Sequence, residues 1–231
     1  MFTKEDLQQI EQHGLTQAQV EQQIDNFCKG FPYLKIVRAA AAGDGVLVMS
    51  DEQIAQAEAR YDEAASTSKI VKFVPASGAA TRMFKELFEY VNDDKRTPGI
   101  DRLLDNIEKF AFWPELAEHI MPDSPDEEIV ESVVKTGLCY GAKPKGLVTF
   151  HAYADGNRKA VEEHLVEGAL YAQDEDKNVH VHFTVSPEHR ELFKARVDAV
   201  VARYEAEFGV KYDITFSEQK ACTDTVAADK D

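Results

Sequence analysis

Apolar residues recur with a helical period through the N-terminal part of the chain. Val20, Ile24 and Phe27 are spaced three or four positions apart, which predicts the apolar face of a helix. Each predicted helix follows a Ser or Thr suited to capping its N-terminus: Thr3, Thr16 and Ser50. We therefore expect an N-terminal helical region over residues 1–68.

From residue 69 onward, short β-branched runs alternate with helical stripes. Three runs are typical of buried strands: Ile70–Val74, Val179–Val185 and Tyr212–Phe216. Strands that alternate with helices form parallel sheets with right-handed crossovers. The pattern predicts an α/β core over residues 69–231, with an open, mainly parallel, partly Rossmann-like sheet and a helical insertion at residues 93–136.

Composition narrows the range of partners. The net charge is −16 and 44% of the 231 residues are hydrophobic, so the chain can bury a core but repels nucleic acid and anionic membranes. We expect neither as a partner, which favours small-molecule ligands. The N-terminus is polar, no apolar run is long enough to span a bilayer, and the three cysteines form no paired motif. These features favour the cytoplasm.

A small-residue turn after the first predicted strand carries the first candidate chemistry. The turn covers residues 77–81, and Arg82 follows it where we expect a helix to begin. Backbone N–H groups in such a turn can approach a phosphate, and a helix N-terminus adds partial positive charge. Arg82 could reach the same anion with a fork of donors. An ordinary strand-to-helix connection with an exposed arginine explains the residues equally well.

Lysines and histidines supply two further candidates. Lys143 and Lys145 stand two positions apart and share a face if the chain is extended there, although surface lysines usually form only a solvated basic patch. His180 and His182 share one face of a predicted strand and could bind a metal together. No third ligand is indicated by spacing, so hydrogen-bonded strand histidines are the favoured interpretation.

The order of these motifs resembles that of the nucleotidyltransferases that make nucleotide sugars, especially the UDP-sugar pyrophosphorylases. The matching segments are residues 77–82, 144–148, 163–165 and 216–219. The chain as a whole is similar to an uncharacterised bacterial family of unknown function that carries the same pattern. The resemblance implies a glycosyltransferase-A-like sheet, with a nucleoside triphosphate and a sugar 1-phosphate as partners.

The resemblance also implies a role for each matching residue. Arg82 would neutralise the departing pyrophosphate, and Lys145 would contact the reacting phosphate. Gln219 would bond the edge of a pyrimidine base. The nucleotide phosphates would lie against the backbone of the turn: Ser77, Gly78, Ala79, Ala80 and Thr81. Ala80 replaces a second glycine of the family pattern, and the stretch of about sixty residues before Lys145 is longer than in most relatives.

The related enzymes use Mg²⁺, held by an aspartate on a later strand, and a second half that binds the sugar phosphate. The sequence contains neither feature, and its Mg²⁺ ligands are not identified, so we expect the N-terminal half of a nucleotidyltransferase-like protein that is inactive alone. The alternatives are a non-catalytic nucleotide-binding or protein-interaction module, and a structural domain whose small-residue loop only packs a helix.

Overall fold

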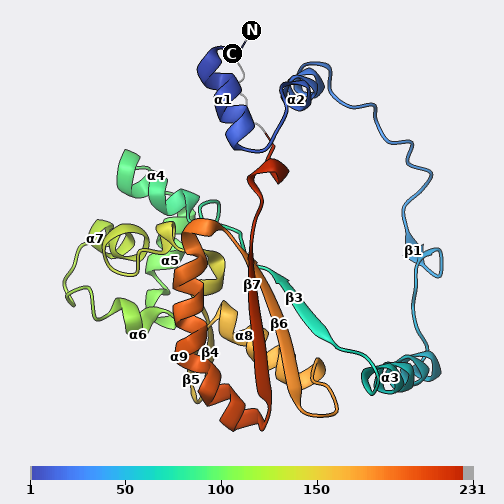
Figure 1. Ribbon diagram of the computed structural model, residues 1–231. Helices are drawn as coiled ribbons and strands as arrows, with labels where there is room; N and C mark the ends of the chain where they lie inside the picture. Colours follow the sequence, from blue (N-terminus) through green and yellow to red (C-terminus); the bar gives the residue numbers. More distant parts are fainter. Residues whose placement is uncertain (1, 226–231) are drawn as a thin grey trace. The chain divides into compact units, whose positions relative to one another are not determined.

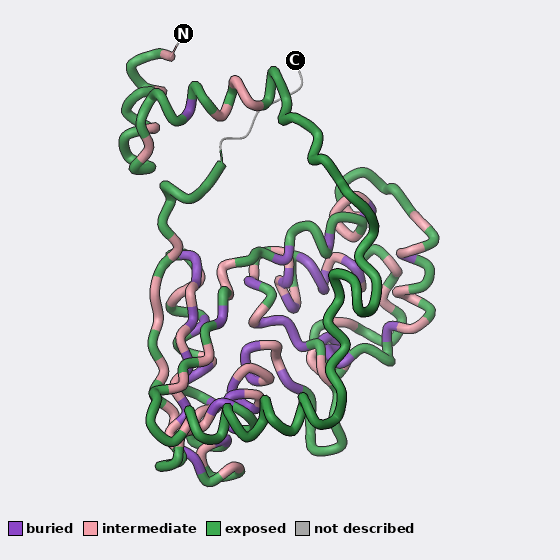
Figure 2. The backbone as a smooth tube through the Cα atoms, turned by 90° about the vertical axis from the view of Figure 1, so that its right-hand side faces the viewer, coloured by how far each residue is buried: buried purple, intermediate pink, exposed green. Residues whose placement is uncertain are grey.

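The computed structural model describes residues 2–225 and divides the chain into two compact units (Figure 1). The core unit comprises Glu63–Glu218. The terminal unit comprises Met1–Asp62 together with Gln219–Asp231. Buried residues gather in the core unit (Figure 2). The fold is mixed α/β, with parallel strands, many helices and no closed barrel.

Helices make up most of the regular structure in the described part of the terminal unit. Thr3 and Thr16 each form a capping box at the start of a helix. Val20 is the only buried residue among the described residues of this unit, and the extended segment at positions 31–49 is exposed throughout. The elements are α1 (Lys4–Gln12), α2 (Gln17–Lys29), β1 (Ala41–Ala42), β2 (Gly45–Val46), α3 (Asp51–Ala65), which ends just inside the core unit, and the short helix η6 (Ala221–Thr223).

A three-stranded parallel sheet forms the centre of the core unit. Its strands are β3 (Val71–Pro75), β6 (Asn178–Val185) and β7 (Lys211–Glu218), in the order β3-β6-β7. The three predicted strands and their parallel pairing are thus confirmed. Because all three strands run the same way, their carboxyl ends meet at one edge of the sheet.

Two long helices cover one face of this sheet. They are α8 (Ala160–Tyr171) and α9 (Arg190–Phe208), and both contribute to the main core with Val181 and Phe183 of β6. The approach of α8 is close at Gly168, where an added Cβ would lie 2.8 Å from Cγ1 of Val179. This packing fixes the central strand against the two helices.

A second, largely helical layer packs beside the sheet and includes the predicted insertion. Its own core surrounds Tyr140, Leu116 and Val148. An antiparallel hairpin, which the sequence did not predict, joins this layer to α8. The elements are α4 (Lys85–Asp93), α5 (Pro98–Leu104), η1 (Ile107–Lys109), α6 (Trp113–Leu116), α7 (Asp126–Glu131), the π-helix η2 (Ser132–Thr136), η3 (Tyr140–Ala142), η4 (Lys145–Leu147), β4 (Thr149–Tyr153), β5 (Gly156–Lys159) and, before α9, η5 (Pro187–His189).

The helix after β3 begins later than the sequence predicts. The helix was expected to begin at Arg82, but α4 starts at Lys85 and residues 81–84 form turns. Ala80 and Phe84 are both buried in the second core, and the N–H of Met83 donates to the carbonyl of Ala80 at 2.9 Å. Burial of these two side chains therefore decides the path of the chain, and the small-residue loop does not lie directly on a helix N-terminus.

A buried carboxylate ties three elements of the core unit together. Glu162, on α8, is 1% exposed and accepts hydrogen bonds from the Lys159 N–H at 3.0 Å and the Tyr204 hydroxyl at 2.9 Å. Two guanidinium nitrogens of Arg196 donate to the same carboxylate, at 3.1 and 2.5 Å. The charge is thus paired and hydrogen-bonded, as burial requires.

Candidate functional site

Two segments that lie far apart in the sequence meet at the carboxyl end of β3. The backbone N–H of Lys145 donates to the carbonyl of Gly78 at 3.2 Å, and Ala79 forms an isolated antiparallel bridge with Pro144. The structure therefore brings the small-residue loop and the Pro144–Lys145 segment together. We call this arrangement the Gly78–Lys145 junction.

The loop presents backbone donors at the junction. The N–H groups of Ser77, Gly78 and Ala79 have no acceptor within residues 2–225, whereas the preceding N–H of Ala76 continues the sheet and donates to Thr184 at 2.7 Å. Gly78 is exposed, its φ lies outside the left-handed region, and a Cβ added to it would meet nothing within 4 Å. Three consecutive amides are thus available to an anion without strain at the glycine.

Two cations flank these amides. Arg82 and Lys145 are both exposed, and neither side chain has an ion-pair or hydrogen-bond partner in the described part of the chain. Lys143 is half-buried, with its ammonium 5.8 Å from the centre of the Tyr140 ring. In a protein of net charge −16, this is a local concentration of positive charge.

The remaining loop residues differ in their surroundings. Ala80 is 0% exposed and belongs to the second core, so its side chain packs the loop rather than facing a ligand. Its φ also lies outside the left-handed region, so a second glycine is not required here. Ser77 is half-buried and Thr81 is exposed.

A serine and a histidine that sequence reasoning missed complete this edge of the sheet. Ser186 follows β6, and its Oγ lies 2.7 Å from Nδ1 of His189, while Nε2 of the same ring lies 3.2 Å from the carbonyl oxygen of Ala142. Ser186 is the N-cap residue of η5, but its side chain makes no capping hydrogen bond. The imidazole instead fastens the end of the central strand to the segment that leads into Pro144. The Ser-x-x-His spacing was the available signal.

Gln219 belongs to the terminal unit, whereas the junction belongs to the core unit. Its side-chain amide donates to Oδ1 of Asp224 at 2.9 Å. The base-reading role implied for Gln219 therefore stays a prediction.

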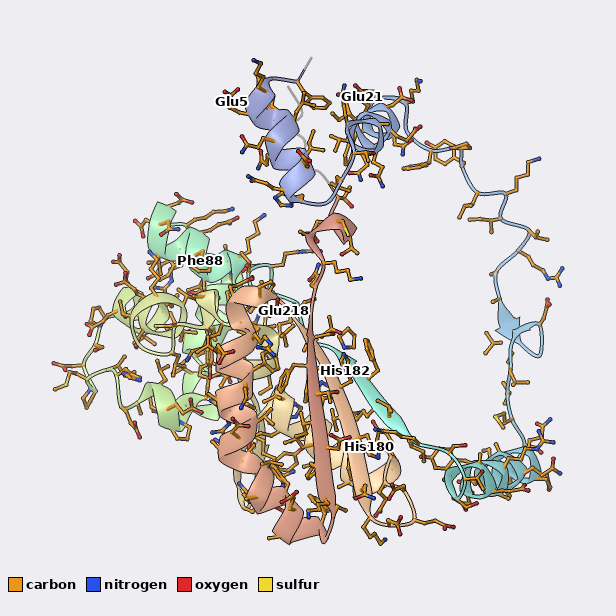
Figure 3. All side chains as sticks on the ribbon, viewed as in Figure 1. Glu5, Glu21, Phe88, His180, His182 and Glu218 are labelled. Carbon is orange, nitrogen blue, oxygen red and sulfur yellow. The ribbon has the colours of Figure 1, made fainter. Side chains whose placement is uncertain are left out.

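Both strand histidines are hydrogen-bonded to side chains of β7. His180 lies 2.8 Å from Asp213, and His182 lies 2.8 Å from both Thr215 and Ser217 (Figure 3). The favoured interpretation of hydrogen-bonded strand histidines is thus confirmed. Within residues 2–225, no group of three or more His, Cys, Asp or Glu side chains could hold a metal ion.

The sheet and the junction define a mixed α/β protein with an anion-compatible loop at the carboxyl edge of a parallel sheet. The chain belongs to the family described as Domain of unknown function (DUF4301), whose model matches residues 3–231. No curated protein and no solved structure matches the chain. None of the helices formed by the described residues has the length and apolar character that crossing a membrane would require.

Proposed function

We propose that the core unit is a cytoplasmic, nucleotidyltransferase-like domain that binds the phosphates of a nucleoside triphosphate at the Gly78–Lys145 junction. The observation that carries this proposal is the backbone bond from Lys145 to Gly78. This bond brings Lys145, which is distant in the sequence, to the loop that carries the unpaired amides and precedes Arg82. A phosphate chain needs this combination of donors and positive charge.

Each group has a distinct part in the proposed site. The amides of Ser77, Gly78 and Ala79 would donate to phosphate oxygens, and Arg82 and Lys145 would neutralise their charge. In the transferase reaction implied by the resemblance, a sugar 1-phosphate oxygen attacks the α-phosphorus and pyrophosphate leaves. The described residues offer no cluster of ligands for Mg²⁺, so we assign no metal ligand and no step through the metal.

The second candidate function is a nucleotide-binding module without catalysis. It is favoured by the same observation, because the amides and cations of the junction bind phosphate without the help of a catalytic carboxylate. Release of pyrophosphate from UTP in the presence of a sugar 1-phosphate distinguishes the two functions.

Binding at the junction is tested by calorimetric titration of the full chain with UTP and ATP at low salt. Arg82→Ala and Lys145→Ala should each weaken binding about ten- to a hundred-fold, because each removes a charge-assisted contact of about 1.5–3 kcal/mol. Neither substitution removes the backbone bond, so the loop should stay in place.

Lys211→Ala is the matched control. Lys211 is an exposed lysine at the start of β7, at the opposite edge of the sheet, and its loss changes the net charge equally. The Lys211→Ala variant should bind UTP and ATP with the affinity of the wild type. If all three variants bind alike, Arg82 and Lys145 are ordinary surface cations and the proposal is wrong.

A further inference from the structure

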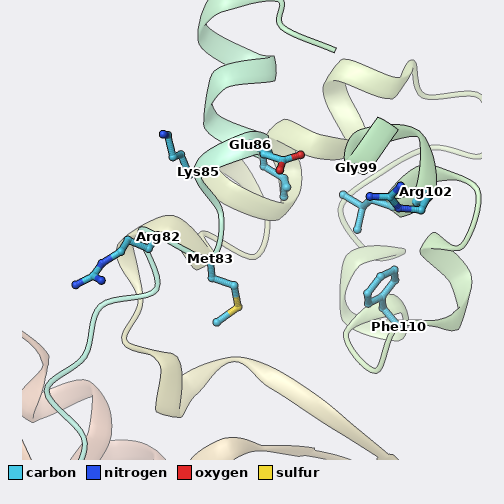
Figure 4. A pocket seen from close by; sticks show the side chains of 9 residues that line it. Arg82, Met83, Lys85, Glu86, Gly99, Arg102 and Phe110 are labelled. Carbon is cyan, nitrogen blue, oxygen red and sulfur yellow. The ribbon is translucent and has the colours of Figure 1, made fainter. Parts of the chain in front are cut away.

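A cavity of about 440 Å³ lies between α4 and α5 (Figure 4). Arg82, which lines it, comes directly after the small-residue loop in the sequence. Apolar side chains form much of its wall, among them Met83, Leu87, Leu103 and Phe110. Its volume is similar to that of small-molecule sites, although it is open to solvent. We call it the α4–α5 cavity.

Charged side chains around the cavity favour an anionic ligand. Arg82, Lys85 and Arg102 line it, against a single lining carboxylate, that of Glu86. Arg82 and Arg102 have no ion-pair partner among the residues that the structure describes. Glu86 is held by the hydroxyl of Thr97, which donates to it at 2.7 Å. Lys85 forms an ion pair with Glu89 at 3.5 Å, so the positive balance at the cavity rests on the two arginines, in a strongly acidic chain.

An aromatic ring is exposed at the same place. Phe110 is 39% exposed and stacks on Phe112, with ring centroids 5.1 Å apart and planes inclined by 19°. Phe112 is buried in the second core, so it fixes the orientation of the exposed ring. A fixed aromatic face beside cations suits a flat, aromatic ligand that carries phosphate.

We infer that the α4–α5 cavity takes the nucleoside of the nucleotide whose phosphates the junction binds, with the base stacked on Phe110. This inference rests on the proposed function. Arg82 belongs both to the loop and to the lining of the cavity, and its guanidinium points away from Phe110 and Arg102 (Figure 4). A ligand that spans the two features would place phosphate beside Arg82 and the base toward Phe110.

The inference is tested by comparing nucleoside diphosphates with inorganic pyrophosphate, which has phosphates but no base. Calorimetric titration of the full chain should show ADP or UDP binding at least tenfold more tightly than pyrophosphate. Phe110→Ala should weaken nucleotide binding about tenfold and leave pyrophosphate binding unchanged, because it removes only the stacking surface. Phe150→Ala, which removes another exposed phenylalanine, on β4, is the control.

Two further measurements keep the result interpretable. Trp113 is the only tryptophan of the chain, and its backbone N–H donates to the carbonyl of Phe110 at 2.9 Å. Because this places Trp113 close to Phe110, nucleotides should change its fluorescence and pyrophosphate should not. Phe110→Leu keeps apolar volume while losing the ring, and it replaces Phe110→Ala if that variant does not fold. It too should weaken nucleotide binding selectively.

The outcomes separate this inference from the proposed function. If nucleotides and pyrophosphate bind with equal affinity, the cavity does not hold the base. The same conclusion follows if loss of the Phe110 ring leaves both affinities unchanged, or weakens both to the same extent. Binding that still depends on Arg82 would then leave the phosphate site standing. A wild-type chain that binds neither pyrophosphate nor nucleotides overturns both proposals.

Discussion

The buried carboxylate of Glu162 offers a direct test of what holds the core unit together. Glu162→Ala removes one acceptor from three neighbours at once, since Lys159, Arg196 and Tyr204 all donate to it. The Tyr204 residue is 0% exposed, so its hydroxyl cannot find water in exchange. The perturbation therefore acts on α8, α9 and the end of β5 together.

The magnitude follows from these contacts. An unsatisfied buried hydroxyl costs about 1–3 kcal/mol. Loss of the acceptor for the first turn of α8 adds about 1 kcal/mol. The Arg196 side chain is 33% exposed and can turn toward water, which limits its share. We expect Glu162→Ala to lower the free energy of unfolding by about 3–5 kcal/mol, the usual effect of breaking a buried pair. Glu162→Gln keeps an acceptor oxygen and should cost about half as much.

The assay is urea unfolding, followed by far-ultraviolet circular dichroism and by Trp113 fluorescence. Glu191→Ala is the control, because the Glu191 side chain is 80% exposed and its ion pair with Arg190 lies on the surface. That substitution should cost less than about 1 kcal/mol. The reasoning is refuted if Glu162→Ala and Glu191→Ala have the same midpoint of urea unfolding and the same dependence of the unfolding free energy on urea concentration.

Two further predictions concern packing and pH. Gly168→Ala should lower the free energy of unfolding by about 1–3 kcal/mol in thermal melts, because its Cβ would crowd Val179, whereas Gly78→Ala, whose Cβ meets open space, should melt like the wild type. The Lys72 ammonium, which donates to Glu167 at 2.6 Å, outweighs burial and holds the pKa of that carboxyl below its ordinary 4.5. This stabilisation is fully present above pH 4.5 and is lost as the pH falls through the lowered pKa. Glu167→Gln should therefore reduce stability in urea titrations at pH 7, and the difference from the wild type should shrink as the pH is lowered below 4.5. A difference that stays constant as the pH falls would contradict this.

The sheet was predictable because the residue pattern within each strand itself favours an extended, half-buried chain. The run Val179–Val185 alternates strictly between buried and half-buried positions, and its β-branched residues favour the extended chain. The hairpin strand Gly156–Lys159 has no such run and is extended because β4 pairs with it. The start of α4 was misplaced because burial of Phe84 in a distant core outweighs local helical periodicity.

The candidate site was predictable only in part. The small-residue turn and the Pro144–Lys145 segment were identified from residue types and from the order of motifs, and the structure joins them through backbone atoms. The Ser186–His189 pair had a local signal in its spacing, but its link to the carbonyl of Ala142, on a distant segment, could not be predicted from the sequence. The lining of the α4–α5 cavity likewise depends on how helices pack, which residue spacing does not report.

The bond that closes the Gly78–Lys145 junction involves no side chain. Any residue other than proline can donate from position 145, and any residue can accept at position 78. Substitutions can therefore change the charge or size of the groups at the loop while the two segments remain joined. Evolution could thus alter which anion this edge of the sheet recognises without first rebuilding the scaffold, and members of the family with different side chains at these two positions could still share the same loop geometry.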